Sequence, residues 1–338
     1  MKIIVGTYTQ GIYQTHLTAT GLTPPTLLAD TPQPTYLNYS RSGFLFSANQ
    51  AGKVGGISVF KLTEDQLIPC DDYLSFAPAP VHLNVDDTHH LLFASNYNGG
   101  YTDIYNFTTT GQLQRLDSFL NVGQGPRPQQ NTSHVHFTCL TPDGRLLVLD
   151  LGTDSLFTFT INDRGQLQDL VATFHFRAGF GPRHLRFDPA QHCVYVLGEL
   201  ASTVAVLNYD AVTGTFHQTQ LISTIPIDWN GQTGGGAIYL AHNGHYLYVS
   251  NRGHNSIMVY RIAGDSTHRH LTAIQNVSSQ GDFPRDFCLS PNDDFLIVGN
   301  QKTNLLSIFS VDAVTGKLTP SLNSVQVPEP VCVKLIPD

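Results

Sequence analysis

The feature that most constrains this chain is a strand–turn–strand unit that returns along nearly its whole length. The copy at residues 179–207, GFGPRHLRFDPAQHCVYVLGELASTVAVL, reads as an apolar strand, a polar turn, a second apolar strand, another turn and the start of a third. Six copies begin at Pro34, Pro80, His134, Pro182, Gly236 and Pro284, about 46 to 54 residues apart. A fourth strand-like run follows, as in TGQLQRLDSFL at residues 110–120.

Four short strands per unit at this period are typical of a β-propeller blade. A partial seventh copy, PVCVKLIPD, begins at Pro330, and residues 3–30 read as three more strands. We therefore predict an all-β, seven-bladed β-propeller with four antiparallel strands per blade. In this fold the N-terminal strands plus the C-terminal strand close the ring and leave no open sheet edge. No linker or change of composition interrupts the pattern, so residues 1–338 are expected to form a single domain.

Composition excludes several classes of protein. Hydrophobic residues make up 41% and charged residues 13%, which favours a buried core over disorder. A net charge of −8 with no basic run argues against nucleic-acid binding. No apolar run approaches the ~18 residues of a membrane helix. Five scattered cysteines without a Cys-x-x-Cys motif, and no signal peptide, predict reduced thiols in a cytoplasmic protein.

Two positions in the repeat carry residues that change from copy to copy. The first lies at the start of the first strand and holds Thr35, Val81, His136, Arg183, Gly236, Arg285 and Val331. The second lies at the end of the second strand and holds Gln50, Tyr97, Leu151, Glu199, Arg252 and Gln301. A tight turn between antiparallel strands puts the start of one beside the end of the other. We therefore expect both positions at one end of the axial channel.

Ionisable residues concentrate in four consecutive copies, which supply His136, Arg183, Glu199, Arg252 and Arg285. Burying unpaired cations is costly, so three arginines at such positions point to an anionic ligand. Arginine forks grip phosphate or carboxylate, and a nearby Glu or His can move protons. The alternative is a structural ion pair between Arg183 and Glu199, with the other arginines solvated.

Other motifs carry weaker signals. His134 and His136 lie on one face of a strand and resemble half of a metal site, but no third ligand follows at a suitable spacing, so we expect no metal. The interruption from Ser223 to Gly236 ends in a glycine run followed by a strand, whereas a phosphate-binding loop opens a helix. We expect a flexible loop there, with Trp229 as a lid.

Several catalytic and cofactor classes lack their signatures in this sequence. Gly-x-Ser-x-Gly, the mark of a serine hydrolase, is absent. No cysteine has an electropositive sequence context, so a thiol nucleophile is not expected. A dinucleotide-binding Gly-x-Gly-x-x-Gly in a strand–helix–strand setting is also missing.

Six motifs support a family resemblance: GTYTQGIY at Gly6, HVHFTCLTPDGR at His134, GPRHLRFDP at Gly181, GELASTV at Gly198, SNRGHNSI at Ser250 and PRDFCLSPNDDFLIVGNQ at Pro284. With them the chain resembles the bacterial 6-phosphogluconolactonase family of seven-bladed propellers, which is similar in fold to fungal carboxy-muconate cyclases. The resemblance implies a cytoplasmic, metal-independent enzyme that acts on lactones without a cofactor.

The resemblance also carries over individual residues. In the muconate cyclases a His, a Glu and arginines of the channel do the work, and the matching residues here are His136, Glu199, Arg183 and Arg252. Arg285 is added by the repeat register. This chain departs from the family pattern at Gly236 and Ala237, which replace larger groups, and this concerns the shape of the substrate more than the fold.

We thus expect a hydrolase that opens a sugar-acid lactone, 6-phospho-D-glucono-1,5-lactone first, by water attack. Glu199 or His136 would act as general base, and arginines including Arg183 would stabilise the oxyanion. The expected substrate-binding residues are Arg252, Arg285, His134, Gln301, Tyr97 and His184.

Three alternatives stay open at this stage. The first is a cyclase-type lactonising enzyme, and the second is a non-catalytic propeller that binds an anionic metabolite or a partner. The third is a calcium-dependent lactonase with Asn96, Glu199, Asn251 and Asn300 as ligands. The expected partner is a small anionic lactone, with no nucleic acid or membrane, and the expected assembly is a monomer or weak dimer.

Overall fold

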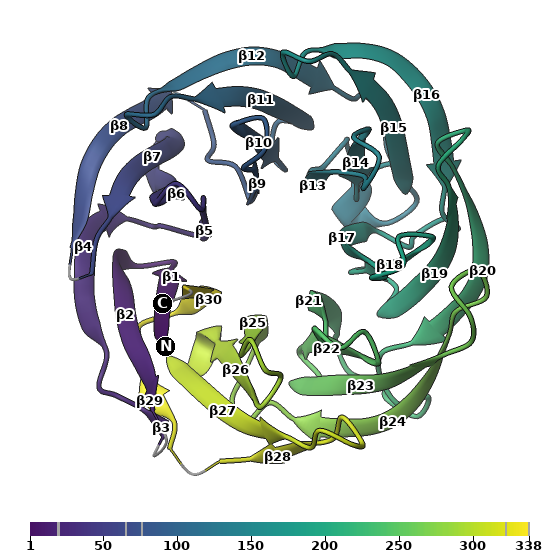
Figure 1. The fold of residues 1–338 in the computed structure, drawn as a ribbon. Helices are drawn as coiled ribbons and strands as arrows, with labels where there is room; N and C mark the ends of the chain where they lie inside the picture. Colours follow the sequence, from purple (N-terminus) through teal and green to yellow (C-terminus); the bar gives the residue numbers. More distant parts are fainter. Residues whose placement is uncertain (19–20, 65, 76, 322, 337–338) are drawn as a thin grey trace. The chain divides into compact units, whose positions relative to one another are not determined.

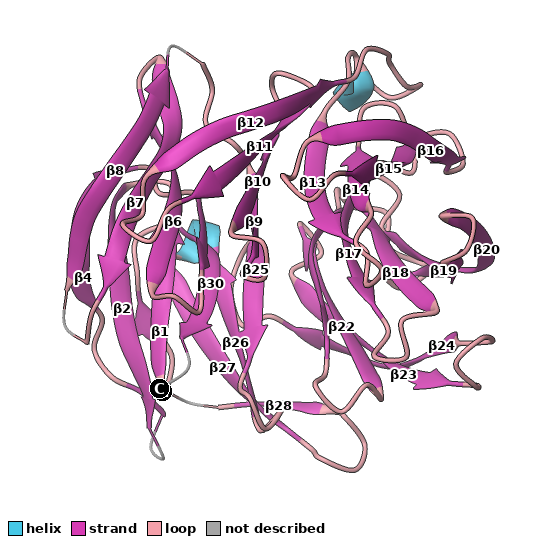
Figure 2. Ribbon diagram, turned by 45° about the horizontal axis from the view of Figure 1, so that its top comes forward, coloured by secondary structure: helices cyan, strands magenta, loops and turns pink. Residues whose placement is uncertain are grey.

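The computed structural model describes residues 1–18, 21–64, 66–75, 77–321 and 323–336. Within these ranges nearly all regular structure is β-strand, as Figures 1 and 2 show. The helices described are two short 3-10 turns, η1 (Pro128–Gln130) and η2 (Gln301–Thr303). No helix in the described ranges has the length and apolar character needed to cross a bilayer.

The chain divides into two compact units. Unit 1 contains Met1–Leu27, His184–Tyr209 and Phe216–Asp338, and unit 2 contains Leu28–Arg183 and Asp210–Thr215. The strand β4 (Thr26–Pro32) includes the first boundary. The expectation of a single domain over residues 1–338 stays a prediction.

Unit 2 contains three four-stranded antiparallel sheets (Figure 1). The first sheet is formed by β5 (Tyr36–Tyr39), β6 (Phe44–Ala51), β7 (Val54–Leu62) and β8 (Leu67–Ser75). The second is formed by β9 (His82–Asp86), β10 (Leu91–Asn96), β11 (Tyr101–Phe107) and β12 (Leu113–Leu120). The third is formed by β13 (Val135–Leu140), β14 (Leu146–Asp150), β15 (Ser155–Ile161) and β16 (Leu167–His175).

Unit 1 holds nearly all of the remaining four sheets. One comprises β17 (Pro182–Phe187), β18 (Cys193–Gly198), β19 (Thr203–Asp210) and β20 (Thr215–Ser223). The next comprises β21 (Gly234–Leu240), β22 (Tyr246–Arg252), β23 (Ser256–Ala263) and β24 (His270–Ser278). A third comprises β25 (Pro284–Leu289), β26 (Phe295–Asn300), β27 (Leu305–Val311), β28 (Leu318–Pro320) and the short β29 (Val325–Gln326).

The last sheet of unit 1 combines both ends of the chain (Figure 1). It contains β1 (Lys2–Thr7), β2 (Gln10–Thr18), β3 (Gly21–Leu22) and β30 (Pro330–Ile336). Strand β1 pairs antiparallel with β30 from Lys2 opposite Ile336 to Thr7 opposite Pro330. The predicted fold, a seven-bladed β-propeller with one blade built from both termini, is confirmed.

The hydrophobic core lies between facing sheets. In unit 2, Phe93 of β10 belongs to a buried cluster with Val148 of β14. In unit 1, Tyr195 of β18 belongs to a cluster with Ile238 of β21 and Tyr260 of β23. These strands alternate apolar and smaller residues and bury both faces of their sheets, which explains the high apolar content noted above.

A repeated side-chain contact ties the fourth strand of one sheet to the fourth strand of the next. In unit 1, the Gln275 amide exchanges two hydrogen bonds with the backbone of Leu318, at 2.7 and 2.8 Å. In three other pairs a leucine N–H likewise donates to a side-chain oxygen on the preceding sheet: Leu113 to Asp71, Leu167 to Asp117, and Leu271 to Gln220. These leucines open the fourth strand-like runs seen in the sequence, so the repeat also sets how neighbouring sheets align.

Candidate functional site

β-Bulges mark the first variable position of the repeat. In β13 the pairing with β14 passes from Val135 to Phe137 and skips His136. The pairing of β25 with β26 skips Arg285 in the same way, and that of β30 with β1 skips Val331. Gly236 lies in a similar irregularity of β21. A bulge turns a side chain out of the regular pleat, so these positions share a register, as the repeat predicted.

The second variable position is also confirmed as a structural equivalence. Tyr97, Leu151, Glu199 and Gln301 each come directly after the last residue of the second strand of their sheets. Arg252 is the last residue of β22, and Gln50 lies one residue before the end of β6. The repeat therefore placed these side chains at the correct end of their strands.

A buried ion pair lies at this position in unit 1. Glu199 Oε1 is 2.8 Å from Arg252 Nη2, and the side chains are 18% and 9% exposed. Arg252 also donates from Nε and Nη2 to the carbonyl of Gly235, at 3.2 and 2.6 Å. Its guanidinium lies 5.4 Å from the centre of the Phe283 ring. Arg252 thus fixes the carboxylate of Glu199 relative to the start of β21.

Arg285 provides a second guanidinium beside this pair. It lies over the ring of Tyr8 at 5.0 Å, and no described residue accepts a hydrogen bond from it or forms an ion pair with it. Burial is the main cause that lowers the pKa of Arg285; the nearby Tyr8 and Glu199 raise it, and Arg252 lowers it further. The three side chains Glu199, Arg252 and Arg285 therefore carry a surplus of one positive charge, while the Asp286 carboxylate, which accepts from the Val333 N–H, has the smallest effect on the pKa of Arg285.

Sequence reasoning singled out neither Tyr8 nor Phe283. Tyr8 belongs to the GTYTQGIY motif, but nothing in that motif shows that its ring lies under Arg285. Phe283 directly precedes the strand that carries Arg285. Its ring, however, meets Arg252 at 5.4 Å and Lys302 at 4.4 Å, so its place beside Arg285 in the sequence gave no signal for the observed cation–π contacts.

The glycine run near residue 235 has a packing role. A Cβ on Gly236 would lie 2.5 Å from the carbonyl oxygen of Pro284, and one on Gly235 would lie 2.9 Å from the Leu197 side chain. Small residues here let β21 approach the start of β25, where Arg285 lies.

The structure corrects the bounds of the predicted loop before this run. Ser223 ends β20 and Gly234 already begins β21, so the loop covers residues 224–233 and not 223–236. The glycines are therefore strand residues because their backbone pairs with β22. In the loop, Trp229 is 38% exposed and packs edge-on against His254 at 4.6 Å. Its role as a lid stays a prediction.

A second cluster lies in unit 2. Arg183 Nη1 contacts His136 Nε2 within hydrogen-bonding distance, and the two residues are 5% and 3% exposed. A guanidinium can only donate, so Nε2 of His136 must present its lone pair. The imidazole is then neutral and carries its proton on Nδ1. In this arrangement Arg183 occupies the nitrogen that would accept a proton.

His134 and Tyr97 belong to the same cluster. The ring of His134 stacks on Tyr97 with centroids 4.1 Å apart, and its Nδ1 donates to the Tyr97 carbonyl at 2.9 Å. Tyr97 in turn meets His136 edge-on at 5.7 Å. His134 is therefore engaged in holding Tyr97. In the described part of the chain no three or more His, Cys, Asp or Glu side chains are grouped so that they could hold a metal ion.

The remaining predicted residues have simpler settings. Gln301 is half-buried, and its N–H donates to the carbonyl of Phe283, so it flanks the unit 1 cluster. His184 is buried in β17 at 5% exposure. The amides of the asparagines considered as calcium ligands donate to backbone carbonyls of linking segments, in the pairs Asn96 with Pro78, Asn251 with Thr224, and Asn300 with Ser279.

Two cysteines of unit 1 are buried as protonated thiols. None of the five cysteines forms a disulfide, and four are buried. Burial raises the pKa of the Cys193 thiol to about 12, and burial likewise raises the pKa of Cys288. Both therefore remain thiols at neutral pH.

Comparison with known proteins adds to this geometry. The model of the seven-bladed β-propeller lactonases matches residues 2–335. The chain belongs to this lactonase family. A 6-phosphogluconolactonase of Bacillus subtilis strain 168 is 34% identical to it over 98% of this chain and 97% of that protein. The family predicted from the sequence motifs is therefore confirmed.

Solved structures agree with this assignment. The crystal structure of a protein from Lactobacillus plantarum superimposes on this lactonase-family chain with a TM-score of 0.95, at 40% identity and with 99% of each chain covered. A periplasmic gluconolactonase of Pseudomonas aeruginosa gives a TM-score of 0.90 at 26% identity, with 98% of each chain covered. Family and fold are thus shown, whereas the substrate is not.

Proposed function

We propose that this chain hydrolyses 6-phospho-D-glucono-1,5-lactone, or a closely related anionic sugar lactone, to the open-chain acid. Membership of the lactonase family and the name of the Bacillus relative support a lactone substrate. One observation favours an anionic one: Arg285 has no described acceptor, beside an ion pair that already neutralises Arg252. A phosphate would supply the missing charge and accept from both arms of the guanidinium.

In the proposed mechanism Glu199 is the general base. The guanidinium of Arg252 at 2.8 Å favours the carboxylate over the carboxylic acid. The carboxylate takes a proton from water, and the water oxygen forms a bond to the lactone carbonyl carbon. The bond from that carbon to the ring oxygen then breaks, and the proton passes to the ring oxygen as it leaves. The products are the ring-opened acid and an unchanged enzyme.

The arginines take separate roles in this proposal. Nη1 of Arg252 donates to no described residue, so it is available to the oxyanion that forms on the carbonyl oxygen. Arg285 binds the phosphate. His136 is a weaker candidate for the base because Arg183 already donates to its Nε2.

The test is hydrolysis of freshly prepared 6-phosphogluconolactone, followed by coupling to 6-phosphogluconate dehydrogenase, with D-glucono-1,5-lactone as the uncharged comparison. We expect Arg285→Ala to lower kcat/KM for the phosphorylated lactone by about 10- to 100-fold, the worth of a charged hydrogen bond. The uncharged lactone should lose little, and Arg285→Lys should recover part of the loss. Arg261→Ala, an exposed arginine of β23, is the matched control.

Two results would overturn the proposal. Wild-type protein that gives no hydrolysis above the spontaneous rate would remove the substrate assignment. An equal loss on both lactones in Arg285→Ala would remove its role as the phosphate anchor. Each assay is repeated with chelator, and we expect unchanged rates because the proposed steps use only protein side chains.

A further inference from the structure

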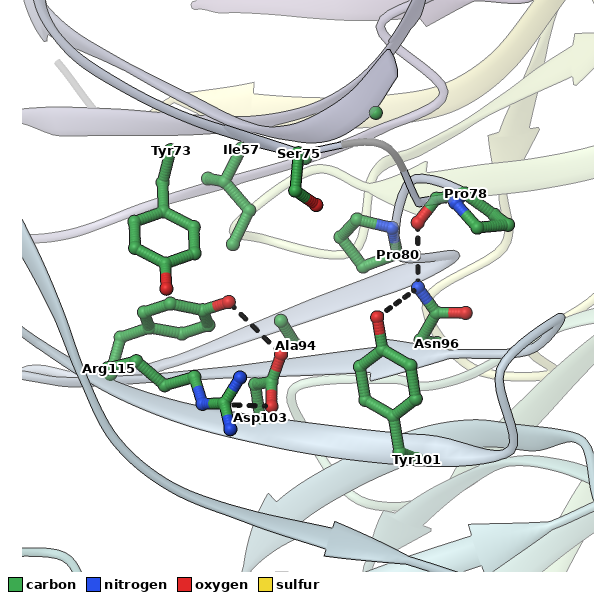
Figure 3. A pocket seen from close by; sticks show the side chains of 13 residues that line it. Ile57, Tyr73, Ser75, Pro78, Pro80, Ala94, Asn96, Tyr101, Asp103 and Arg115 are labelled. Atoms are coloured by element: carbon green, nitrogen blue, oxygen red, sulfur yellow. Dashed lines mark hydrogen bonds and ion pairs between the residues drawn. The ribbon is translucent and has the colours of Figure 1, made fainter. Parts of the chain in front are cut away.

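A cavity in unit 2, separate from both clusters above, lies between the sheet of β5–β8 and the sheet of β9–β12 (Figure 3). Its volume is about 140 Å³, and its polar lining includes Tyr73, Ser75, Asn96, Tyr101, Asp103 and Arg115. A water molecule takes up about 30 Å³ in the liquid, and pockets for drug-sized ligands begin near 300 Å³. The cavity thus has room for several waters or for one small molecule.

The central polar group of this cavity is the carboxylate of Asp103, in a residue that is only 7% exposed. Its Oδ2 accepts from the Tyr105 hydroxyl at 3.2 Å. Its Oδ1 accepts no hydrogen bond from any described residue, and Arg115 Nε is 3.6 Å away, beyond good hydrogen-bond geometry. A buried acceptor without a donor costs free energy, which a ligand hydroxyl would recover.

Further hydroxyl groups converge on the same space. Figure 3 shows the hydroxyls of Tyr73 and Ser75 pointing from β8 toward the side chains of β11 and β12. On the other wall the Tyr101 hydroxyl accepts from the Asn96 amide at 3.0 Å, which leaves its own proton to donate. The rings of Tyr73 and Tyr105 meet edge-on at 5.0 Å and give the cavity an apolar side.

Two glycines of β7 hold the first wall close to this space. A Cβ on Gly56 would lie 2.1 Å from the Tyr73 carbonyl oxygen, and one on Gly55 would lie 2.5 Å from the Ala79 nitrogen. Both residues line the cavity. Any residue larger than glycine at these two positions would clash with neighbouring backbone, so the glycines set the shape of this wall.

The charges of the cavity balance. It holds one carboxylate and one guanidinium, and its phenols are neutral, since burial first and Asp103 second raise the pKa of both Tyr101 and Tyr105. A cation would compete with Arg115 for the Asp103 carboxylate, and an anion would be repelled by that carboxylate. A neutral molecule with several hydroxyls satisfies donors and acceptors alike and can set its C–H face against the aromatic rings.

We propose that this cavity binds a small neutral polyol, with Asp103 Oδ1 accepting from one ligand hydroxyl and the hydroxyls of Tyr73, Ser75 and Tyr101 bonding to others. This binding site does not depend on the lactonase reaction, because none of its residues belongs to the clusters assigned to that reaction.

The test is saturation-transfer NMR and calorimetry with glycerol, erythritol and myo-inositol as probes, and with tetramethylammonium and inorganic phosphate as charged comparisons. We expect at least one polyol to bind with Kd about 1 to 10 mM. Asp103→Asn keeps the shape and should weaken binding about tenfold, the worth of one such hydrogen bond. Ser75→Trp, at an exposed position on the rim, should abolish binding by filling the space.

Asp169→Asn, at an exposed carboxylate of β16, is the matched control and should bind as the wild type does. If Asp103→Asn fails to fold, the polyol affinities of Tyr73→Phe and Ser75→Trp test the proposal instead. Both positions are exposed, so these substitutions should not prevent folding. Three results would each overturn the proposal: polyol binding by Ser75→Trp, no polyol binding by wild type, or tighter binding of tetramethylammonium or phosphate than of every polyol by wild type. Lactone hydrolysis is measured in parallel and should not change in Ser75→Trp.

Discussion

The Glu199–Arg252 pair of unit 1 and the Asp103–Arg115 pair of unit 2 are made of the same two kinds of charge in different settings. The first pair is 2.8 Å apart with Arg252 9% exposed, and Arg285 lies beside it with no described acceptor. The second is 3.6 Å apart with Arg115 51% exposed, and phenols surround it. On the two proposals made above, the ligand would follow from the sum of charges in a cluster and not from the presence of an arginine.

The largest effect should come from Glu199→Gln, which removes the proposed base and keeps the shape. We expect kcat for the phosphorylated lactone to fall about 100- to 10,000-fold, the usual worth of general-base catalysis. Glu64→Gln, at an exposed glutamate, serves as control. A kcat within the range of this control would mean that the unit 1 cluster binds substrate without performing the proton transfer.

The next effect concerns stability and compares the two arginines directly. Arg252→Met removes one partner of a buried pair and should lower the free energy of unfolding by about 3 to 5 kcal/mol. Arg115→Met removes a half-exposed guanidinium that is 3.6 Å from its partner and should cost less than about 1 kcal/mol. Urea unfolding of both variants measures the difference. Equal losses would show that the two pairs are not energetically distinct.

A smaller effect is expected at alkaline pH. Burial, together with Asp103, raises the pKa of Tyr105, so the folded protein keeps this phenol protonated where the unfolded chain ionises, above pH ~10. The unfolded state then binds fewer protons, and stability falls as pH rises. Tyr105→Phe should reduce that slope by about 1.4 kcal/mol per pH unit.

Urea unfolding curves recorded from neutral pH to above pH ~10 measure how the free energy of unfolding changes with pH. Tyr13→Phe, at a half-buried position of β2, is the control and should leave the slope close to that of wild type. A slope that Tyr105→Phe does not change would show that the phenol ionises equally in both states, and the cavity would then not be the dry, neutral setting described above.

The smallest expected effect is a gain of phosphate binding when the charge of the cavity is made to resemble that of the unit 1 cluster. Asp103→Asn leaves Arg115 without a carboxylate, so the cavity acquires the positive surplus seen beside Arg285. This variant should gain weak binding of inorganic phosphate, with Kd about 1 to 10 mM at low salt. Lactone hydrolysis should stay at the wild-type rate. If phosphate binding does not appear, net charge alone does not decide which ligands these clusters accept.

The sequence predicted most of the fold because each blade repeats the same apolar pattern and turn. It also placed His136 and Arg285 at equivalent positions, which proved to be bulges. It did not predict that Arg252 would hold Glu199, or that Arg183 would contact His136. A repeat register aligns Cα positions, whereas side-chain partners depend on rotamers and on strands from other blades.

Sequence reasoning missed the cavity for a related reason. Asp103 occupies a strand position where other copies carry Ser58, Ala205, Met258 or Ser307. The available signal for the cavity was a single carboxylate at a strand position where the other copies carry apolar or small residues. Its significance came from Tyr73 of β8, which belongs to another sheet, and from Arg115 of the next strand, β12.

The pairing of β1 with β30 has a consequence for how the chain folds. Lys2 pairs with Ile336, so this sheet needs a loop closure of nearly the whole chain, whereas each other sheet joins strands connected by short turns. The entropy of such a closure costs about 5 kcal/mol, and it is recovered only when the last strand arrives. All six residues of β1 are buried in the finished sheet. During synthesis one edge of this strand stays open until the last strand has emerged, and an open apolar edge can pair with other chains and aggregate.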